Sequence, residues 1–194
     1  PVTTVSAGSF ESIGNPLASA VDFTLLSKPI PANLDEAYYV WDPLLPGPRW
    51  GLGGYQLIAS SNAYKPSPGG TANYSNAVPY TKIQSGQAFM VHATGAGGNV
   101  SFPEACKIIG SPMVYRGAEL PNTRSRYYVR TELYQADRLM DAAVAAFDPS
   151  FSNEYDYRDA LKITNGAENI GINCKGNWVS IEGRAPIMRR DTIF

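Results

Sequence analysis

Short runs in which apolar and polar residues alternate recur along most of the chain, with turn residues between them. The clearest runs are 55–59, 87–93, 126–134 and 178–182. A period of two over so few residues is typical of half-buried strands. In 126–134 the alternation places Val129 and Leu133 on one face and Arg130 and Glu132 on the other. We therefore predict an all-β, mainly antiparallel fold in which Val129 and Leu133 are buried.

Gly- and Asn-rich segments between the runs predict two hairpins. One would join 87–93 to 100–102, and the other would join 170–174 to 178–182. Helix formers gather only at 33–37, which predicts one short turn, and at 137–146. The second stretch fits either a helix or a loop followed by a strand, and we favour the strand.

Two long segments rich in Pro and Gly, 43–54 and 62–79, predict functional or mobile loops. A composition shift at 117–123 divides the chain into an N-terminal β lobe (1–120) and a C-terminal β lobe (121–194). We expect antiparallel sandwich or jelly-roll-like lobes with little helix. The last residues read as the start of a strand, so we expect the second lobe to be truncated. A natural edge strand is the alternative.

Composition and charge narrow the possible partners and chemistry. The 16 Lys and Arg nearly balance the 17 Asp and Glu, so no basic excess favours nucleic acid as a partner. No apolar run approaches the roughly 18 residues of a membrane span. A single histidine and two cysteines exclude a zinc-finger cluster. Gly-x-Ser-x-Gly and phosphate-binding loop motifs are absent. We expect no enzymatic activity.

The titratable residues offer few candidate sites. His92 lies in the predicted strand 87–93 without a nucleophile or carboxylate beside it, which indicates an ordinary strand residue. Carboxylates gather between Asp137 and Asp159, where we expect solvated turn residues with ordinary pKa values. A calcium site at Asp156 and Asp159 is the alternative, since Ca²⁺ accepts loop oxygens in flexible geometry. No other cofactor is expected.

Aromatic residues in and beside the long loops are candidates for a ligand site. These residues are Trp50, Tyr55, Tyr64 and Tyr74. An exposed ring can stack on the apolar face of a sugar, but the same rings can instead pack beneath the loops as part of the core.

The two cysteines, Cys106 and Cys174, also leave two interpretations open. In an exported protein, a disulfide between them is more favourable than two exposed thiols. Two separately buried free thiols are the alternative.

An ordered set of motifs resembles a segment that recurs in large secreted proteins of Bacteroidetes. Residues 10–23 (FESIGNPLASAVDF) are similar to the family's GNPYPSAIDW segment, with Leu17 in place of the usual tyrosine. Further matches are Ile83, Gly86, Gln87, Phe89 and Val91 to I-x-x-GQ-x-F-x-V; Phe102 and Glu104 to F-x-E; Asp156, Asp159, Ala160 and Lys162 to fD-x-x-DA-x-K; and 179–186 to LSI-x-GR-x-P. The cysteines are a departure from the pattern.

The resemblance implies a β-rich region without chemistry of its own. Such regions precede the sorting domain that the type IX secretion system reads, which implies an extracellular or cell-surface location. We therefore expect a non-enzymatic structural or adhesive module whose partners are other domains of the same chain. A carbohydrate-binding module that uses the loop aromatics is the alternative. Surface polysaccharide or another surface protein would then be the partner.

Overall fold

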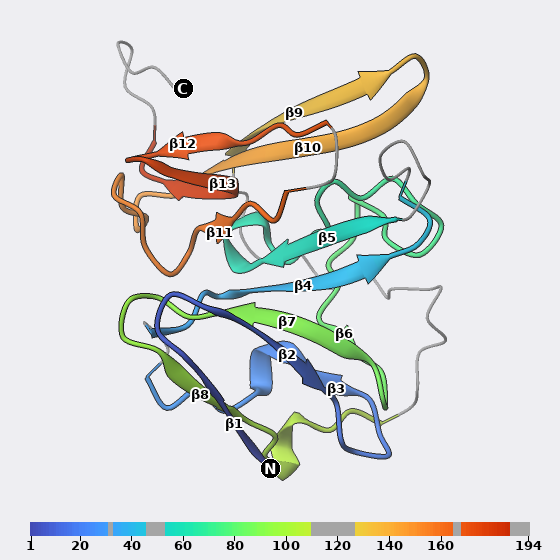
Figure 1. Cartoon of the computed structure of the whole chain (residues 1–194), viewed down its shortest axis with the longest axis vertical. Coiled ribbons are helices and arrows are strands. Elements are labelled where there is room, and N and C mark those ends of the chain that lie inside the picture. Colours follow the sequence, from blue (N-terminus) through green and yellow to red (C-terminus); the bar gives the residue numbers. More distant parts are fainter. Residues whose placement is uncertain (31–32, 46–52, 110–126, 165–167, 187–194) are drawn as a thin grey trace.

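The computed structural model describes residues 1–30, 33–45, 53–109, 127–164 and 168–186 (Figure 1). In these residues every regular element longer than three residues is a β-strand. The helical segments described are single 3-10 turns: η1 (Phe23–Leu25), η3 (Ser60–Asn62) and η4 (Glu104–Cys106). The predicted all-β, mainly antiparallel class is confirmed.

A four-stranded antiparallel sheet forms the middle layer of the molecule, in the order β2-β7-β4-β5 (Figure 1). Its strands are β2 (Phe10–Gly14), β7 (Ala88–His92), β4 (Ala37–Asp42) and β5 (Gly54–Ala59). In β4, the consecutive side chains of Tyr38 and Tyr39 are both fully buried although they point to opposite faces. This sheet is therefore covered on both sides.

Two short ribbons cover one face of the middle sheet. They pair β1 (Val2–Val5) with β8 (Gly98–Ser101) and β3 (Val21–Asp22) with β6 (Lys82–Ile83). The apolar residues between ribbons and sheet form the first core: Val5, Ile13, Val21, Phe23, Leu26, Leu34, Tyr38, Val40, Ile58, Tyr74, Ile83, Phe89, Val91, Ala93, Val100 and Cys106. The hydroxyl of Tyr38 donates to the carbonyl of Tyr80 at 2.6 Å, so this buried phenol is satisfied.

A second sheet covers the other face of the middle sheet (Figure 1). It runs β11-β13-β10-β9, and β12 also pairs with β13. The strands are β9 (Tyr127–Gln135), β10 (Arg138–Phe147), β11 (Ala160–Leu161), β12 (Ile172–Cys174) and β13 (Asn177–Arg184). β10 and β13 are parallel, unlike the other strand pairs that the structure describes. The stretch 137–146 is thus strand rather than helix, as favoured from its sequence, but the strand begins at Arg138, without the loop that was expected before it.

The layer between the two sheets is the inter-sheet core. It comprises Ala37, Tyr39, Leu57, Ala59, Val144, Ala160 and Ile181. The hydroxyl of Tyr39 crosses this layer and donates to the carbonyl of Leu161 at 3.0 Å. A third cluster, the outer core, lies beneath β12 and comprises Ala143, Ala145, Phe147, Ile172, Cys174 and Val179.

One predicted hairpin is confirmed and the other is wrong. β12 pairs with β13 across Lys175 and Gly176, as predicted. However, β8 pairs with β1, whereas β7 pairs with β2 and β4. At the turn between β7 and β8, Gly97 has φ of +68°, and an added Cβ would lie 2.8 Å from the carbonyl oxygen of Val5. The chain therefore leaves the middle sheet at this turn and enters a covering ribbon.

The predicted burial of Val129 and Leu133 in β9 is also wrong, since Leu133 is only half-buried and Val129 is exposed. Val129 is 51% exposed, while its cross-strand neighbour Ala145 is 2% exposed on the same face. β9 is the edge strand of its sheet, and the residues that cover Ala145 do not extend over Val129. Alternation identified the strand correctly, but it does not show whether either face is covered.

The predicted boundary after residue 120 lies outside the described residues. Among the described strands, none from the first 109 residues shares a sheet with one from 127–186. Residues 187–194, where a truncated strand was expected, also lie outside the described part.

Candidate functional site

The described loop aromatics pack on the body of the protein, which is one of the two alternatives left open by the sequence. Tyr74 is only 5% exposed and belongs to the first core, with its ring 4.9 Å from that of Tyr80. Tyr64 is half-buried and packs on the same core. Tyr55 is half-buried against Trp41, with ring centroids 5.1 Å apart. Trp50 lies outside the described residues. Tyr55, Tyr64 and Tyr74 therefore serve mainly as packing residues.

Asp156 and Asp159 lie in one turn, where their four carboxylate oxygens already have partners. Asp156 accepts from the backbone N–H of Arg158 at 2.8 Å and lies 3.4 Å from its guanidinium. Asp159 accepts from the backbone N–H groups of Asp156 at 2.8 Å and of Gly183 at 2.9 Å. Among the described residues, no three His, Cys, Asp or Glu groups are placed to hold a metal ion. These bonds fix the turn to itself and to β13, and the calcium site at Asp156 and Asp159 stays a prediction.

The expectation of ordinary, solvated carboxylates is wrong for Asp159. Its side chain is buried, and burial raises its pKa to about 7, with the nearby Asp156 and Glu182 charges acting in the same direction. The two backbone hydrogen bonds partly oppose this rise. The turn around it is polar in sequence, but Asp159 points under β13 toward Gly183 and is removed from water.

The predicted disulfide is absent. Cys106 and Cys174 are both free and buried, the first in the first core and the second in the outer core. The middle sheet and the inter-sheet core separate these two clusters, so the alternative of two separate thiols is the one found. Burial raises the pKa of both thiols, that of Cys174 to about 12, which suppresses the reactive thiolate.

His92 has a carboxylate partner that sequence reasoning missed. Its Nδ1 lies 2.8 Å from Oδ2 of Asp35, and the backbone N–H of Asp35 also donates to the His92 carbonyl at 3.0 Å. Both side chains are buried, and the ring of Phe10 lies 4.7 Å from the imidazole. A His–Asp pair resembles part of a catalytic triad, but catalysis would also need an accessible nucleophile. No described hollow is lined by either residue.

A second buried pair joins the outer strands. Lys162 Nζ lies 2.5 Å from Asp141 Oδ2, with side-chain exposures of 3% and 0%. The Asp141 carboxylate also accepts from the backbone N–H groups of Ala142 and Ile170, at 2.9 and 2.8 Å. Asp141 lies where the β9–β10 register shifts, and Lys162 follows β11. The pair fixes an irregular strand to the segment that covers it.

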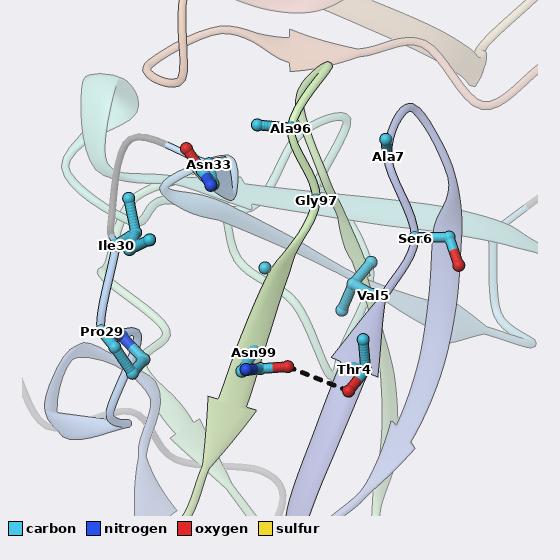
Figure 2. A pocket seen from close by; sticks show the side chains of 11 residues that line it. Thr4, Val5, Ser6, Ala7, Pro29, Ile30, Asn33, Ala96, Gly97 and Asn99 are labelled. Carbon is cyan, nitrogen blue, oxygen red and sulfur yellow. Dashed lines mark hydrogen bonds between the residues drawn. The ribbon is translucent and has the colours of Figure 1, made fainter.

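Two open hollows are described on the surface. The first, of about 420 Å³, lies between the β1–β8 ribbon and the residues Pro29, Ile30 and Asn33 (Figure 2). Its lining has no charged side chain, and its two central polar groups are joined, since Thr4 Oγ1 donates to Asn99 Oδ1 at 2.9 Å. It therefore offers few polar groups to orient a ligand.

The second hollow, of about 330 Å³, lies between the loop 62–79 and the strands β9 and β10. We call it the loop–strand hollow. Its lining residues are Asn62, Lys65, Asn76, Ala77, Tyr128, Arg130 and Val144. It combines two cations, two amides and an exposed aromatic ring. The loop was predicted from its composition to be functional or mobile, but none of these residues was predicted to bind a ligand.

Comparisons with family models, curated proteins and solved structures gave no match. In the described residues, no helix has the length and apolar character needed to cross a bilayer.

Proposed function

We propose that this chain is a non-enzymatic structural or adhesive module of a large extracellular protein exported by the type IX secretion system. The observation that carries the proposal is the placement of its reactive groups. His92, Asp35, Asp159 and both thiols are buried within layers of the fold. The side chains of His92 and Asp35 bond to each other, and Asp159 accepts from the backbone N–H of Gly183.

The residues that carry the family resemblance have structural roles, which supports a scaffold. The Asn15 amide of the GNP segment donates to the carbonyls of Ser19, Ile83 and Gln84, at 2.9, 3.2 and 3.0 Å. Ile83 itself belongs to the second matched motif. Likewise, the matched residues Asp159 and Gly183 are hydrogen-bonded to each other. Two pairs of motifs that are distant in sequence therefore meet in the fold.

An extracellular location can be tested on intact cells of the source organism. Antibodies raised against this chain should label unpermeabilised cells or culture medium, and external protease should remove the cell-surface signal. Disabling the secretion system should move the signal into the cell. A signal found only after lysis, in cells whose secretion system is intact, would contradict the proposal.

The absence of catalysis needs a separate test. The purified chain should not hydrolyse polysaccharides, peptides or esters. If turnover is found and Asp35→Asn or Asp159→Asn abolishes it while the variant stays folded, the non-enzyme proposal fails.

A further inference from the structure

We infer that the loop–strand hollow is a binding site for an acidic saccharide of the uronic acid class. The inference rests on the proposed function and deepens it, because it gives an adhesive module its ligand. The site differs from the surface of loop aromatics that the sequence left open as one alternative. It uses the same long loop, but its ring comes from β9.

The loop is held rigidly enough to form one wall of a site. Ser67 and Leu57 exchange two backbone hydrogen bonds of 2.7 and 2.8 Å, which tie the loop to β5. The backbone N–H of Gly69 donates to Gln56 Oε1 at 2.7 Å, and Gln56 Nε2 donates in turn to buried Asp42 at 2.9 Å. A wall fixed before binding reduces the entropy lost when a ligand binds.

Arg130 forms the opposite wall and is itself held in place. Its Nε donates to Glu132 Oε1 at 2.6 Å, and its Nη2 donates to the Pro68 carbonyl of the loop. Among the described residues, its Nη1 group makes no hydrogen bond. A positioned guanidinium with spare N–H groups suits a planar carboxylate, which it can bind through more than one hydrogen bond.

Lys65 adds a second cation. Within the described residues it has no carboxylate partner, and its Nζ lies 5.9 Å from the ring centroid of Tyr128. Glu132 partly neutralises Arg130, so Lys65 gives the hollow a net positive charge. This charge favours an anionic ligand over a neutral one.

Tyr128 and the two asparagines indicate the remainder of the ligand. The Tyr128 side chain is 56% exposed and offers an apolar plane to the C–H face of a sugar ring. Asn62 uses its Nδ2 on the Lys65 carbonyl at 2.9 Å, while its Oδ1 makes no bond within the described residues. This oxygen and the exposed Asn76 amide can bond sugar hydroxyls. A carboxylate beside an apolar ring face and hydroxyls is the chemistry of a uronic acid.

Calorimetric titration of the chain with oligogalacturonate tests the site. We expect binding that weakens with added salt, because ions that enter the open hollow screen the attraction between the ligand carboxylates and the two cations. Neutral oligogalactose should bind at least about tenfold more weakly, which corresponds to one lost charged contact. Lys65→Gln and Tyr128→Ala should each weaken oligogalacturonate binding about tenfold, with an unchanged melting temperature.

Matched controls come from the same surface. Tyr127→Ala removes another exposed tyrosine of β9 outside the hollow, and Lys175→Gln removes an exposed lysine elsewhere; both should bind as the parent does. No binding of oligogalacturonate, equal binding of the neutral sugar, or unaffected binding by the Lys65 and Tyr128 variants would overturn the site. These failures would leave the structural role standing, whereas intracellular location or hydrolysis of the sugar would overturn the proposed function.

Discussion

Asp35 and His92 are 57 positions apart, yet their side chains meet at 2.8 Å beneath the ring of Phe10. Burial raises the pKa of Asp35 to about 6, although the hydrogen bond to His92 opposes the rise. The other carboxylate oxygen, Oδ1, is buried and has no hydrogen-bond partner among the residues that the structure describes. The charged form of Asp35 is thus less favourable in the folded protein than in the unfolded chain.

Asp35 and Asp159 predict that the protein is more stable in mild acid. Their native pKa values, about 6 and about 7, exceed the value near 4 of an unfolded aspartate. The native state therefore binds more protons between about pH 4 and pH 7, and its free energy of unfolding falls as the pH rises through that window. Melting temperatures measured at intervals from pH 5 to pH 8, at constant ionic strength, should fall with rising pH (~ a few degrees).

The Asp159→Asn variant is the control for this pH dependence. An amide offers one oxygen to the two backbone N–H groups that Asp159 serves, so the variant should be less stable throughout. Its melting temperature should nevertheless vary less between pH 5 and pH 8. A slope equal to that of the parent would exclude Asp159 as its source.

We predict that the effects of Lys162→Met and Asp141→Asn on the free energy of unfolding are strongly coupled. Lys162→Met leaves the Asp141 carboxylate buried without its counter-ion, which costs about 3–5 kcal/mol in comparable cases. Adding Asp141→Asn removes the orphaned charge and keeps one acceptor for the backbone, so the double variant should recover part of the loss. Denaturant unfolding of the four proteins measures the coupling free energy.

The exposed pair Lys175 and Glu154 provides the comparison, with side-chain exposures of 60% and 70%. Lys175→Met should cost less than about 1 kcal/mol, because water screens the pair. A similarly small cost for Lys162→Met would show that the Asp141 pair is hydrated in solution.

The two thiols should be protected but unpaired. Native protein, never exposed to reductant, should react slowly with a thiol reagent, because Cys106 and Cys174 are buried and their raised pKa values keep them protonated. The same protein in denaturant should show two reactive thiols, whether or not reductant is added. If no thiol reacts in denaturant without reductant, Cys106 and Cys174 are joined by a disulfide.

The strands could be predicted from sequence because alternation and turn residues act over a few positions. Turn residues between two short strands predicted the β12–β13 hairpin correctly, whereas β10 shows no alternation, because both of its faces are covered. Alternation did not show that Val129 is exposed, because whether an edge strand is covered depends on elements distant in the chain. The Asp35–His92 pair was missed for the same reason. The fold brings the two residues together, and their separation of 57 positions matches no sequence motif.

We predict that replacing Asn15 lowers the free energy of unfolding more than replacing an exposed amide does. Besides its three donated bonds to Ser19, Ile83 and Gln84, its Oδ1 accepts from the backbone N–H of Leu17 at 3.0 Å. Asn15→Ala would leave several polar groups in a mainly buried setting without a partner, at about 1–3 kcal/mol for each group that water cannot reach. Asn15→Asp should cost more, because a carboxylate has no N–H and would face three carbonyl oxygens.

Asn99→Ala is the matched control, since that exposed amide accepts one bond from Thr4, and its loss should cost under about 1 kcal/mol. Denaturant unfolding should therefore rank stability as Asn99→Ala, Asn15→Ala and Asn15→Asp, from highest to lowest, and an Asn15→Ala variant as stable as the control would show that this amide does not hold the turn.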